Sequence, residues 1–500
     1  MGVKPWLAVG ALLAVGAAPA AKLDPDTAAW WKTTAQLSSD AMEGRDTGSA
    51  AYLRAARLVA SKFEALALKP AGENGGWFQS VPMNEISITS ARVRVGQRPL
   101  VFLHDLTISP NDATPARFDV PLTYAGYCGA GSLGDVRGRI VICHGTRKPG
   151  LPSADERNSA LRAAGAIGML TIADPGFTVE PPRWPYAYAR TVRLATEPRS
   201  SQAFVTGTLN AGSLGKLLVG TGKDAAALVA AGSKGQPLPS FALRDRLRAD
   251  FNIRRREISS PNFLALLPGS DPTLANEVIL LSAHLDGYGY GEPVKGDRLY
   301  NGTLDDAAYV ALLIRLAERR RGQPFRRPIL FAAYTGEEKG LLGSRWYVSH
   351  PTVPLSRIGG VINLDQLRPI FPLELLTVHA LNDTTLGDDA RAVADSLGIE
   401  VQTDPEPERN LLRRTDHWPF MEAGIPATNF VFGFRPGSRS EQIYRQWYRA
   451  GYHRPQDDLN QQMDWKAAAD FNRFFYKLVE RVADQPAAPT WKPGSTLKPQ

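Results

Sequence analysis

The stretch I-L-L-S-A-H-L-D-G at residues 279–287 decides the fold, together with N-G-T-L-D-D-A-A at residues 301–308. Its apolar run has the length of a buried strand and ends at His284. Because positions two apart share a face of an extended chain, Asp286 can accept a hydrogen bond from one imidazole nitrogen while the other nitrogen binds a metal. Asp305 stands just before an apolar, helix-spaced segment, where a carboxylate is electrostatically favoured. The pattern suggests a metal site, and a core histidine beside a helix cap is the structural alternative.

The first 20 residues, M-G-V-K-P-W-L-A-V-G-A-L-L-A-V-G-A-A-P-A, predict a secretory signal peptide. One lysine precedes an apolar stretch, and small residues mark a cleavage point after Ala20. The apolar stretch is too short to span a bilayer comfortably, and no later run approaches about 18 uninterrupted apolar residues. We therefore expect a soluble exported protein, secreted or periplasmic, without stable membrane insertion.

Composition narrows the class of protein further. Five hundred residues, 43% of them apolar, are enough for more than one hydrophobic core. The net charge of +8 comes largely from scattered arginines, such as those at 254–256, and such runs are usually solvated. No nucleic-acid-binding motif stands beside them, so we expect no nucleic-acid partner.

Cys128 and Cys143 are the only cysteines in the sequence. Their spacing is neither that of a redox pair nor that of a zinc ribbon. In an oxidising compartment the pair could close a small loop, so a disulfide is favoured over two free buried thiols.

The pattern of helix-like and β-like segments changes along the chain, and this change predicts an inserted domain. After the signal peptide, residues 21–109 begin with two helix-like segments, 26–39 and 50–68, and form the first part of a main domain. In residues 110–250, short β-like pieces alternate with loops, and R-G-R-I-V-I-C and A-A-G-A-I-G-M-L resemble the β-rich protease-associated (PA) domain. A continuation of the main domain is the alternative. The main domain resumes over 251–485, and the Pro- and Lys-rich tail, 486–500, is predicted to be disordered.

Strand and helix patterns alternate throughout the second part of the main domain. This alternation predicts an α/β fold with a mostly parallel mixed sheet and helices on both faces. In such sheets the ligand site lies at the carboxyl ends of the strands, where His284 and Asp365 fall. The strand candidates are 262–267, 278–283, 329–334, 361–365, 373–379 and 427–432.

Three further groups join the opening stretch in one chemistry. Glu337 and Glu338 follow a buried strand, Asp365 ends another, and His453 lies in a polar loop whose Asp457-Asp458 could orient its imidazole. Each has a structural explanation by itself, as a surface acid, a loop cap or an exposed ring. Jointly, the nitrogen and oxygen ligands suit two zinc ions that share a bridging carboxylate. The set is His284, Asp305, Glu338, Asp365 and His453, with Glu337 left over as a general base.

The motifs H-L-D, L-D-D-A, G-E-E-K-G-L-L-G-S, N-L-D and Y-H-R-P, spread over about 260–460, resemble family 28 of the metallopeptidases, the di-zinc aminopeptidases. The resemblance implies two Zn²⁺ per chain, bridged by Asp305, with His284 and Asp365 completing one site and Glu338 and His453 the other. It also implies that Glu337 takes a proton from a metal-bridged water that attacks the first peptide carbonyl. Asp286 would support His284, and the Asp305-Asp306 peptide would be cis.

The sequence departs from the family pattern at two positions. Many members carry an oxyanion-stabilising tyrosine four residues before the Asp of a Ser/Thr-Asp-His motif, whereas this chain has Leu412 there. His417, Arg413 and Tyr444 are candidates to contact the oxyanion or the substrate instead. Gly287 stands where exported bacterial relatives often have a further histidine. The remaining histidines match no motif and are interpreted as structural: His104, His144, His350 and His379.

These observations predict an exported zinc-dependent aminopeptidase that hydrolyses N-terminal residues from peptides. A carboxypeptidase or dipeptidase on the same scaffold is an alternative, with Arg409, Arg413 and Arg414 as its anion site. A non-catalytic binding ectodomain is a second alternative. It should have lost a ligand or the base, and here all six positions are filled.

Overall fold

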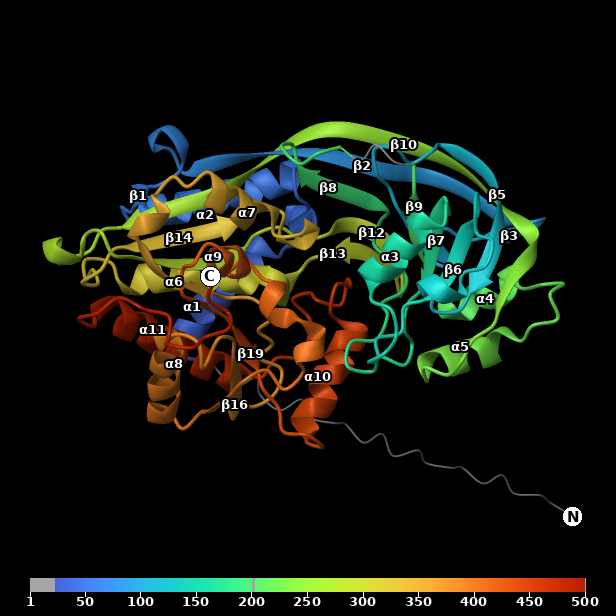
Figure 1. Cartoon of the computed structure of the whole chain (residues 1–500). Helices are drawn as coiled ribbons and strands as arrows, with labels where there is room; N and C mark the ends of the chain where they lie inside the picture. The colour runs from blue at the N-terminus through green and yellow to red at the C-terminus, as the bar shows by residue number, and fades with distance from the viewer. Residues whose placement is uncertain (1–22, 200–202, 500) are drawn as a thin grey trace, which may run out of the picture.

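A computed structural model describes residues 23–199 and 203–499 as two lobes joined by one long sheet (Figure 1). The predicted signal peptide lies outside the described residues. The helices are α1 (Pro25–Leu37), α2 (Ala50–Ala65), α3 (Ala154–Ala163), α4 (Leu214–Leu217), α5 (Ala225–Ser233), α6 (Ala308–Arg319), α7 (Leu342–Ser349), α8 (Thr385–Ser396), α9 (Trp418–Glu422), α10 (Arg439–Ala450) and α11 (Trp465–Asp484). None of these described helices is long and apolar enough to cross a membrane.

The strands fall into one large sheet and two small ones. The first half of the chain contributes β1 (Lys69–Pro70), β2 (Phe78–Val95), β3 (Arg98–Leu100), β4 (Leu106–Ser109), β5 (Arg117–Ala125), β6 (Ile140–His144), β7 (Gly168–Ile172), β8 (Arg190–Leu194), β9 (Val205–Leu209) and β10 (Ser240–Leu267). The second half contributes β11 (Val278–His284), β12 (Gly289–Val294), β13 (Asp297–Tyr300), β14 (Ile329–Tyr334), β15 (Ile358–Asn363), β16 (Leu375–Val378), β17 (Glu400–Gln402), β18 (Ala427–Thr428) and β19 (Phe430–Phe432).

The first lobe has the predicted α/β architecture around β11. Its strands lie in the order β18-β15-β11-β14-β10, with β18, β15, β11 and β14 parallel and β10 antiparallel to β14. Ile279 and Leu281 of β11 pack in a core with α1, α2, α6 and α11, whereas Val278 and Leu280 pack in a second core with α7 and α9. Successive side chains of a strand face opposite sides, so an uninterrupted apolar run is what a sheet covered on both faces requires.

The predicted strand over 427–432 is in fact two strands in different sheets. β18 pairs with β15 in the large sheet, and β19 pairs with β16 in a small sheet that also contains β17. Both halves are apolar and buried, and periodicity alone does not reveal a change of pairing partner between them.

The second lobe is β-rich and continues the same sheet in the order β10-β5-β6-β7-β9-β4. β2 and β10 run antiparallel over most of their lengths and bridge the two lobes, as the blue and yellow-green ribbons of Figure 1 show. β10 spans 28 residues, so the predicted boundary between 250 and 251 falls inside one continuous strand. Residues 98–109, assigned to the main domain, pack in the core of the β-rich lobe.

A disulfide links Cys128 to Cys143, whose Cα atoms are 5.6 Å apart. The bridge lies in a small core of the β-rich lobe, between the sheet and α3. The structure therefore selects the disulfide over two free thiols.

The disorder predicted for the tail does not fit residues 486–499. Trp491 pairs with Thr384 as an isolated β-bridge, and its indole N–H donates to the carbonyl of Gly424. The Lys492 ammonium donates to Asp388. Pro and Lys disfavour regular secondary structure, but one half-buried side chain and a few hydrogen bonds are enough to fix an irregular segment on a folded surface.

Candidate metal centre

Three neighbouring strands bring the predicted residues to one edge of the sheet. β11 lies between β15 and β14, and all three run parallel. His284 is the last residue of β11 and lies in register with Tyr334, the last residue of β14. Glu337 and Glu338 follow β14 by a few residues, and Asp365 follows β15 by two. Parallel strands end at the same edge, so positions distant in sequence converge there.

The five predicted ligands form two groups that share Asp305. His284, Asp305 and Asp365 each offer a ligand atom within 4.8 Å of the others, and so do Asp305, Glu338 and His453. The Asp305 carboxylate lies between the two histidines, with Oδ1 3.3 Å from Nε2 of His284 and Oδ2 3.4 Å from Nε2 of His453. The same nitrogen of His453 lies 3.2 Å from Oε2 of Glu338. This geometry suits two ions bridged by one carboxylate.

Asp305 lies in an irregular turn, residues 303–307, that precedes α6. The Asp305-Asp306 peptide bond is cis, as the family resemblance implies. The Asp306 carboxylate accepts a hydrogen bond from the backbone N–H of His284, and that of Asp457 accepts one from the N–H of Leu304. Asp457 therefore fixes the Asp305 turn. The sequence suggested that Asp457 orients His453, but its carboxylate is used in this turn instead.

Buried charge is concentrated around Asp305. Burial opposes ionisation of its carboxyl, but the Arg368 guanidinium, 3.3 Å away, and the two histidines outweigh this and hold the pKa of Asp305 well below its usual value. In Glu338 and Asp365 the effect of burial dominates. Together with neighbouring carboxylates, burial raises the pKa of Glu338 to about 8 and that of Asp365 to about 6.

A second observation indicates that the candidate ligands fit metal ions. One carboxylate oxygen each of Asp305, Glu338 and Asp365 is buried without a hydrogen-bond partner. Oδ2 of Asp305 faces the Arg368 guanidinium at 3.3 Å. Buried polar atoms in folded proteins are nearly always paired, so the oxygens of Glu338 and Asp365 require a ligand or a cation.

Asp286 supports His284 mainly through its backbone. Its carbonyl oxygen lies 3.1 Å from Nδ1 of His284, whereas the nearer carboxylate oxygen is 3.8 Å away. The carboxylate instead accepts from the hydroxyl of Thr47 and from the backbone N–H of Glu337. Asp286 thus ties the predicted base to the strand end that bears His284, and Oε2 of Glu337 comes within 3.9 Å of the His284 imidazole.

Tyr288 contacts His453, although the sequence did not single it out. Its hydroxyl lies 2.9 Å from Nδ1 of His453, the nitrogen that faces away from the carboxylates. The Tyr288 ring packs against Tyr188, 5.7 Å between centroids, and the ammonium of Lys339 lies over both rings. Tyr188 belongs to residues 173–189, which connect β7 to β8 and are called the strap below. In the sequence, Tyr288 is marked only by its position four residues after His284. This spacing does not reveal that its partner is His453, 165 residues away.

Two buried arginines were also missed. Arg45, in the segment M-E-G-R-D-T-G-S, donates to the carbonyls of Leu285, Asn301 and Gly302, and so holds both halves of the opening stretch together. Arg368 donates to the carbonyl of Leu304 besides facing Asp305. Both are fully buried, and a lone arginine in a polar segment gives no sequence signal of burial.

Of the three predicted substrate contacts, none touches the two groups in the described structure. The Tyr444 hydroxyl accepts from Arg409, and the Arg413 guanidinium lies 4.7 Å from the Trp418 ring centroid. His417 is buried, with Nδ1 bonded to the hydroxyl of Thr415 and its ring stacked on His379. Its neighbour Asp416 lies nearer the site, where its charge helps to raise the pKa of Glu337, after burial and the closer carboxylates.

The arginines proposed for an acidic substrate end are largely occupied. Arg414 makes two hydrogen bonds to Glu180 of the strap, and Arg409 pairs with Glu180 and Glu406. Burial disfavours the Glu180 carboxylate, but Arg414, Arg183 and Arg409 outweigh this and lower the pKa of Glu180 to about 2. This ion-pair group joins the strap to the main lobe.

The four histidines outside the motifs have structural partners. His144 hydrogen-bonds the Tyr124 hydroxyl, His104 pairs with Glu292, His350 stacks on Trp346 and His379 stacks on His417.

Part of the chain matches a known peptidase family. The family model of Peptidase family M28 matches residues 262–479, which include every member of the two groups. Leupeptin-inactivating enzyme 1 of Streptomyces exfoliatus is 28% identical over 173 residues, 34% of this chain and 36% of the relative. Aminopeptidase YwaD of Bacillus subtilis is 26% identical over 187 residues, 37% of this chain and 36% of the relative. The matches thus span about a third of these curated relatives.

Similarity in fold extends over almost the whole chain. The structure of a zinc aminopeptidase from Bacillus subtilis, BSAP, superposes with a TM-score of 0.61 at 18% identity, covering 93% of this chain and 97% of that one. The shared fold therefore includes the β-rich lobe. The match to peptidase family M28 covers residues 262–479, a little under half of the chain.

Proposed function

We propose that the protein is a zinc-dependent aminopeptidase that removes N-terminal residues from peptides and binds two Zn²⁺ ions. The observation that carries the proposal is the pair of residue groups sharing Asp305, with buried carboxylate oxygens of Glu338 and Asp365 left without partners. The names of two similar proteins are consistent with this proposal, since one is an aminopeptidase and the other a zinc aminopeptidase.

His284, Asp305 and Asp365 would hold one ion, and Asp305, Glu338 and His453 the other. Bound zinc would supply Lewis acidity and lower the pKa of a water molecule towards neutral pH. Imidazole and carboxylate ligands suit zinc, whereas an all-oxygen set would favour magnesium or calcium.

Glu337 is the proposed general base. Its side chain is buried beside His284, and its backbone N–H is fixed by Asp286. We expect Oε2 to accept the proton of the water that attacks the first peptide carbonyl and to return it to the leaving amine. The free α-amino group of the substrate would lie near the same carboxylate, which favours cleavage at the amino terminus.

Export and the identity of the β-rich lobe belong to the same proposal. The N-terminal sequence pattern and the disulfide both agree with an oxidising compartment. We assign the β-rich lobe, around the originally predicted 110–250, to a PA domain, with its strands interrupting the main domain between β2 and β10.

The test compares Glu337→Gln with wild type for zinc content and for hydrolysis of amino acid nitroanilides. Loss of a general base costs about 10²–10⁴-fold in turnover, and two zinc ions per chain should remain. Glu422→Gln, an exposed acid at the end of α9, is the matched control and should behave as wild type. Near-normal turnover in Glu337→Gln with intact zinc would refute the role of the base. Zinc-loaded wild type that cleaves only carboxyl-terminal residues would replace the aminopeptidase with the carboxypeptidase alternative.

A further inference from the structure

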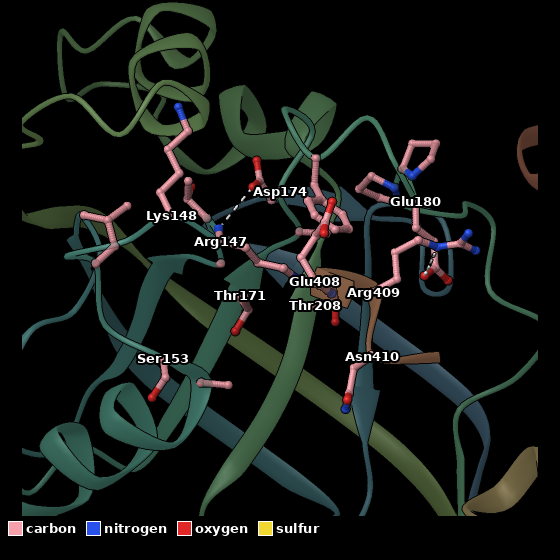
Figure 2. Close-up of a pocket in the computed structure, with 18 of the residues that line it drawn as sticks. Arg147, Lys148, Ser153, Thr171, Asp174, Glu180, Thr208, Glu408, Arg409 and Asn410 are labelled. Atoms are coloured by element: carbon pink, nitrogen blue, oxygen red, sulfur yellow. Dashed lines mark hydrogen bonds and ion pairs between the residues drawn. The ribbon is translucent and has the colours of Figure 1, made fainter. Parts of the chain in front are cut away.

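A cavity of about 950 Å³ lies between the two lobes, beside the metal centre but not part of it (Figure 2). Its walls come from the loop after β6, the start of α3, the strap and residues 408–414 of the main lobe. None of the residues in the two metal-binding groups lines it. A volume of this size accommodates several residues of a peptide.

The walls of this cavity carry more positive than negative charge. Its cationic residues are Arg147, Lys148, Arg157, Arg183, Arg409 and Arg414. Its acids are Asp174, Glu180 and Glu408. Glu180 is already paired with arginines of both lobes, so the β-rich wall keeps an excess of positive charge.

Arg157 is a buried cation on that wall whose hydrogen-bonding capacity is not fully used. Its side chain is 6% exposed, one of its terminal nitrogens donates to the carbonyl of Pro152, and its Nε has no partner. It lies in the first turn of α3, whose N-terminal residues also line the cavity. The first turn of α3 already carries Asp155 and Glu156, so it is the buried guanidinium N–H without a partner, and not the helix terminus, that requires an acceptor. On the opposite wall, one terminal nitrogen of buried Arg409 is also without a partner.

Only one aromatic ring separates this cavity from the metal centre. The Arg183 guanidinium lies 4.6 Å from the ring centroid of Tyr452, whose ring lies 3.8 Å from that of His453. On the cavity side, Arg414 donates to the hydroxyl of Tyr452. Each residue of an extended peptide covers about 3.3 Å, so these two separations of 3.8 and 4.6 Å correspond to two or three residues of a peptide that extends from the metals past Tyr452.

We propose that the interlobe cavity binds a carboxylate of the peptide substrate at that position and so selects peptides with an acidic residue there. This inference rests on the proposed aminopeptidase activity. The β-rich lobe would then determine substrate preference, with Arg157 and Lys148 as the selecting cations.

The kinetic test uses peptide amides that differ by one charge: Leu-Ala-Asp-amide against Leu-Ala-Asn-amide, and Leu-Ala-Ala-Asp-amide against its Asn counterpart. A charge-assisted hydrogen bond predicts about a tenfold higher kcat/KM for the Asp peptide of at least one pair. The ratio should fall towards one in Arg157→Gln and fall in part in Lys148→Gln, whose exposed side chain carries no core packing. Arg94→Gln, an exposed arginine of β2 outside the cavity, should keep the full ratio.

A binding test separates this inference from the proposed function. N-acetyl-Leu-Ala-Asp-amide and its Asn counterpart have no free amino group and are not aminopeptidase substrates, so calorimetric titration of the purified protein measures binding alone. Tighter binding of the Asp peptide, lost in Arg157→Gln, supports the cavity even if no peptide is cleaved and the aminopeptidase proposal fails. Cleavage without any Asp preference in rate or in binding overturns the inference and leaves the aminopeptidase intact. A preference that persists in both Arg157→Gln and Lys148→Gln overturns it as well.

Discussion

Replacing Tyr288 with phenylalanine removes one hydroxyl group and should weaken one of the two metal sites. In the structure this hydroxyl lies 2.9 Å from Nδ1 of His453, while Nε2 faces Asp305 and Glu338. If Nε2 holds the metal, Nδ1 carries the proton and donates it to Tyr288, which fixes both the tautomer and the ring orientation. Phenylalanine keeps the ring contacts with Tyr188 and loses only the acceptor.

The loss of such a hydrogen-bond partner typically weakens metal binding about 10–100-fold. This corresponds to about 1.4–2.7 kcal/mol. Only the ion held by Glu338 and His453 should be affected to this extent, because the contacts of His284 and Asp365 are unchanged. The expected result is therefore one weakened and one nearly normal zinc affinity.

Competition with a chromophoric chelator measures both zinc affinities. Tyr290→Phe is the matched control, because this residue of β12, two positions further along the chain, is 52% exposed and its ring contacts the guanidinium of Arg298. Two unchanged affinities in Tyr288→Phe would refute the reasoning, and so would equal weakening of both sites. The first outcome would mean that packing alone orients His453, and the second that Tyr288 supports the site as a whole.

Two other perturbations test the buried charges. Arg368→Gln leaves Asp305 without its nearest cation, and breaking a buried pair in this way costs about 3–5 kcal/mol. Thermal unfolding should show a large loss in the metal-free protein and a smaller one with zinc, and equal losses would contradict the role of Arg368 as the charge partner of Asp305. Burial lowers the pKa of His144 from 6.5 to about 4, so below pH 6.5 the unfolded chain binds a proton that the folded protein does not. Stability should therefore fall as the pH falls from about 6.5 to about 4, by about 3 kcal/mol from this residue. Urea unfolding should show a weaker pH dependence in His144→Gln, and an unchanged dependence would rule His144 out as a source.

Part of the candidate metal centre could be predicted because His284, Glu337-Glu338 and Asp365 lie at or just after strand ends. The buried run before His284 and the strands before Glu337 and Asp365 are continuous in sequence, and parallel strands must end at the same edge. The order of the five candidate ligands and the candidate base along the chain was therefore enough to group them.

The surroundings of the ligands could not be predicted, because they come from segments far apart in the chain. Tyr444 has the right chemistry for an oxyanion contact but packs beside Arg409, and Asp457 fixes the Asp305 turn. The contact of Tyr288 with His453 and the position of the strap depend on how long loops cross the surface, for which no sequence period exists.

The sequence by itself determined the α/β layering, the family motifs and the set of candidate ligands, because these follow from local periodicity and from residue chemistry. Only the tertiary structure decided that β10 runs unbroken through both lobes, that Arg368 balances Asp305 and that a cationic cavity opens beside His453. These features depend on contacts between residues tens to hundreds of positions apart. Their free energy arises from burial and charge pairing, which exist only once the chain has folded.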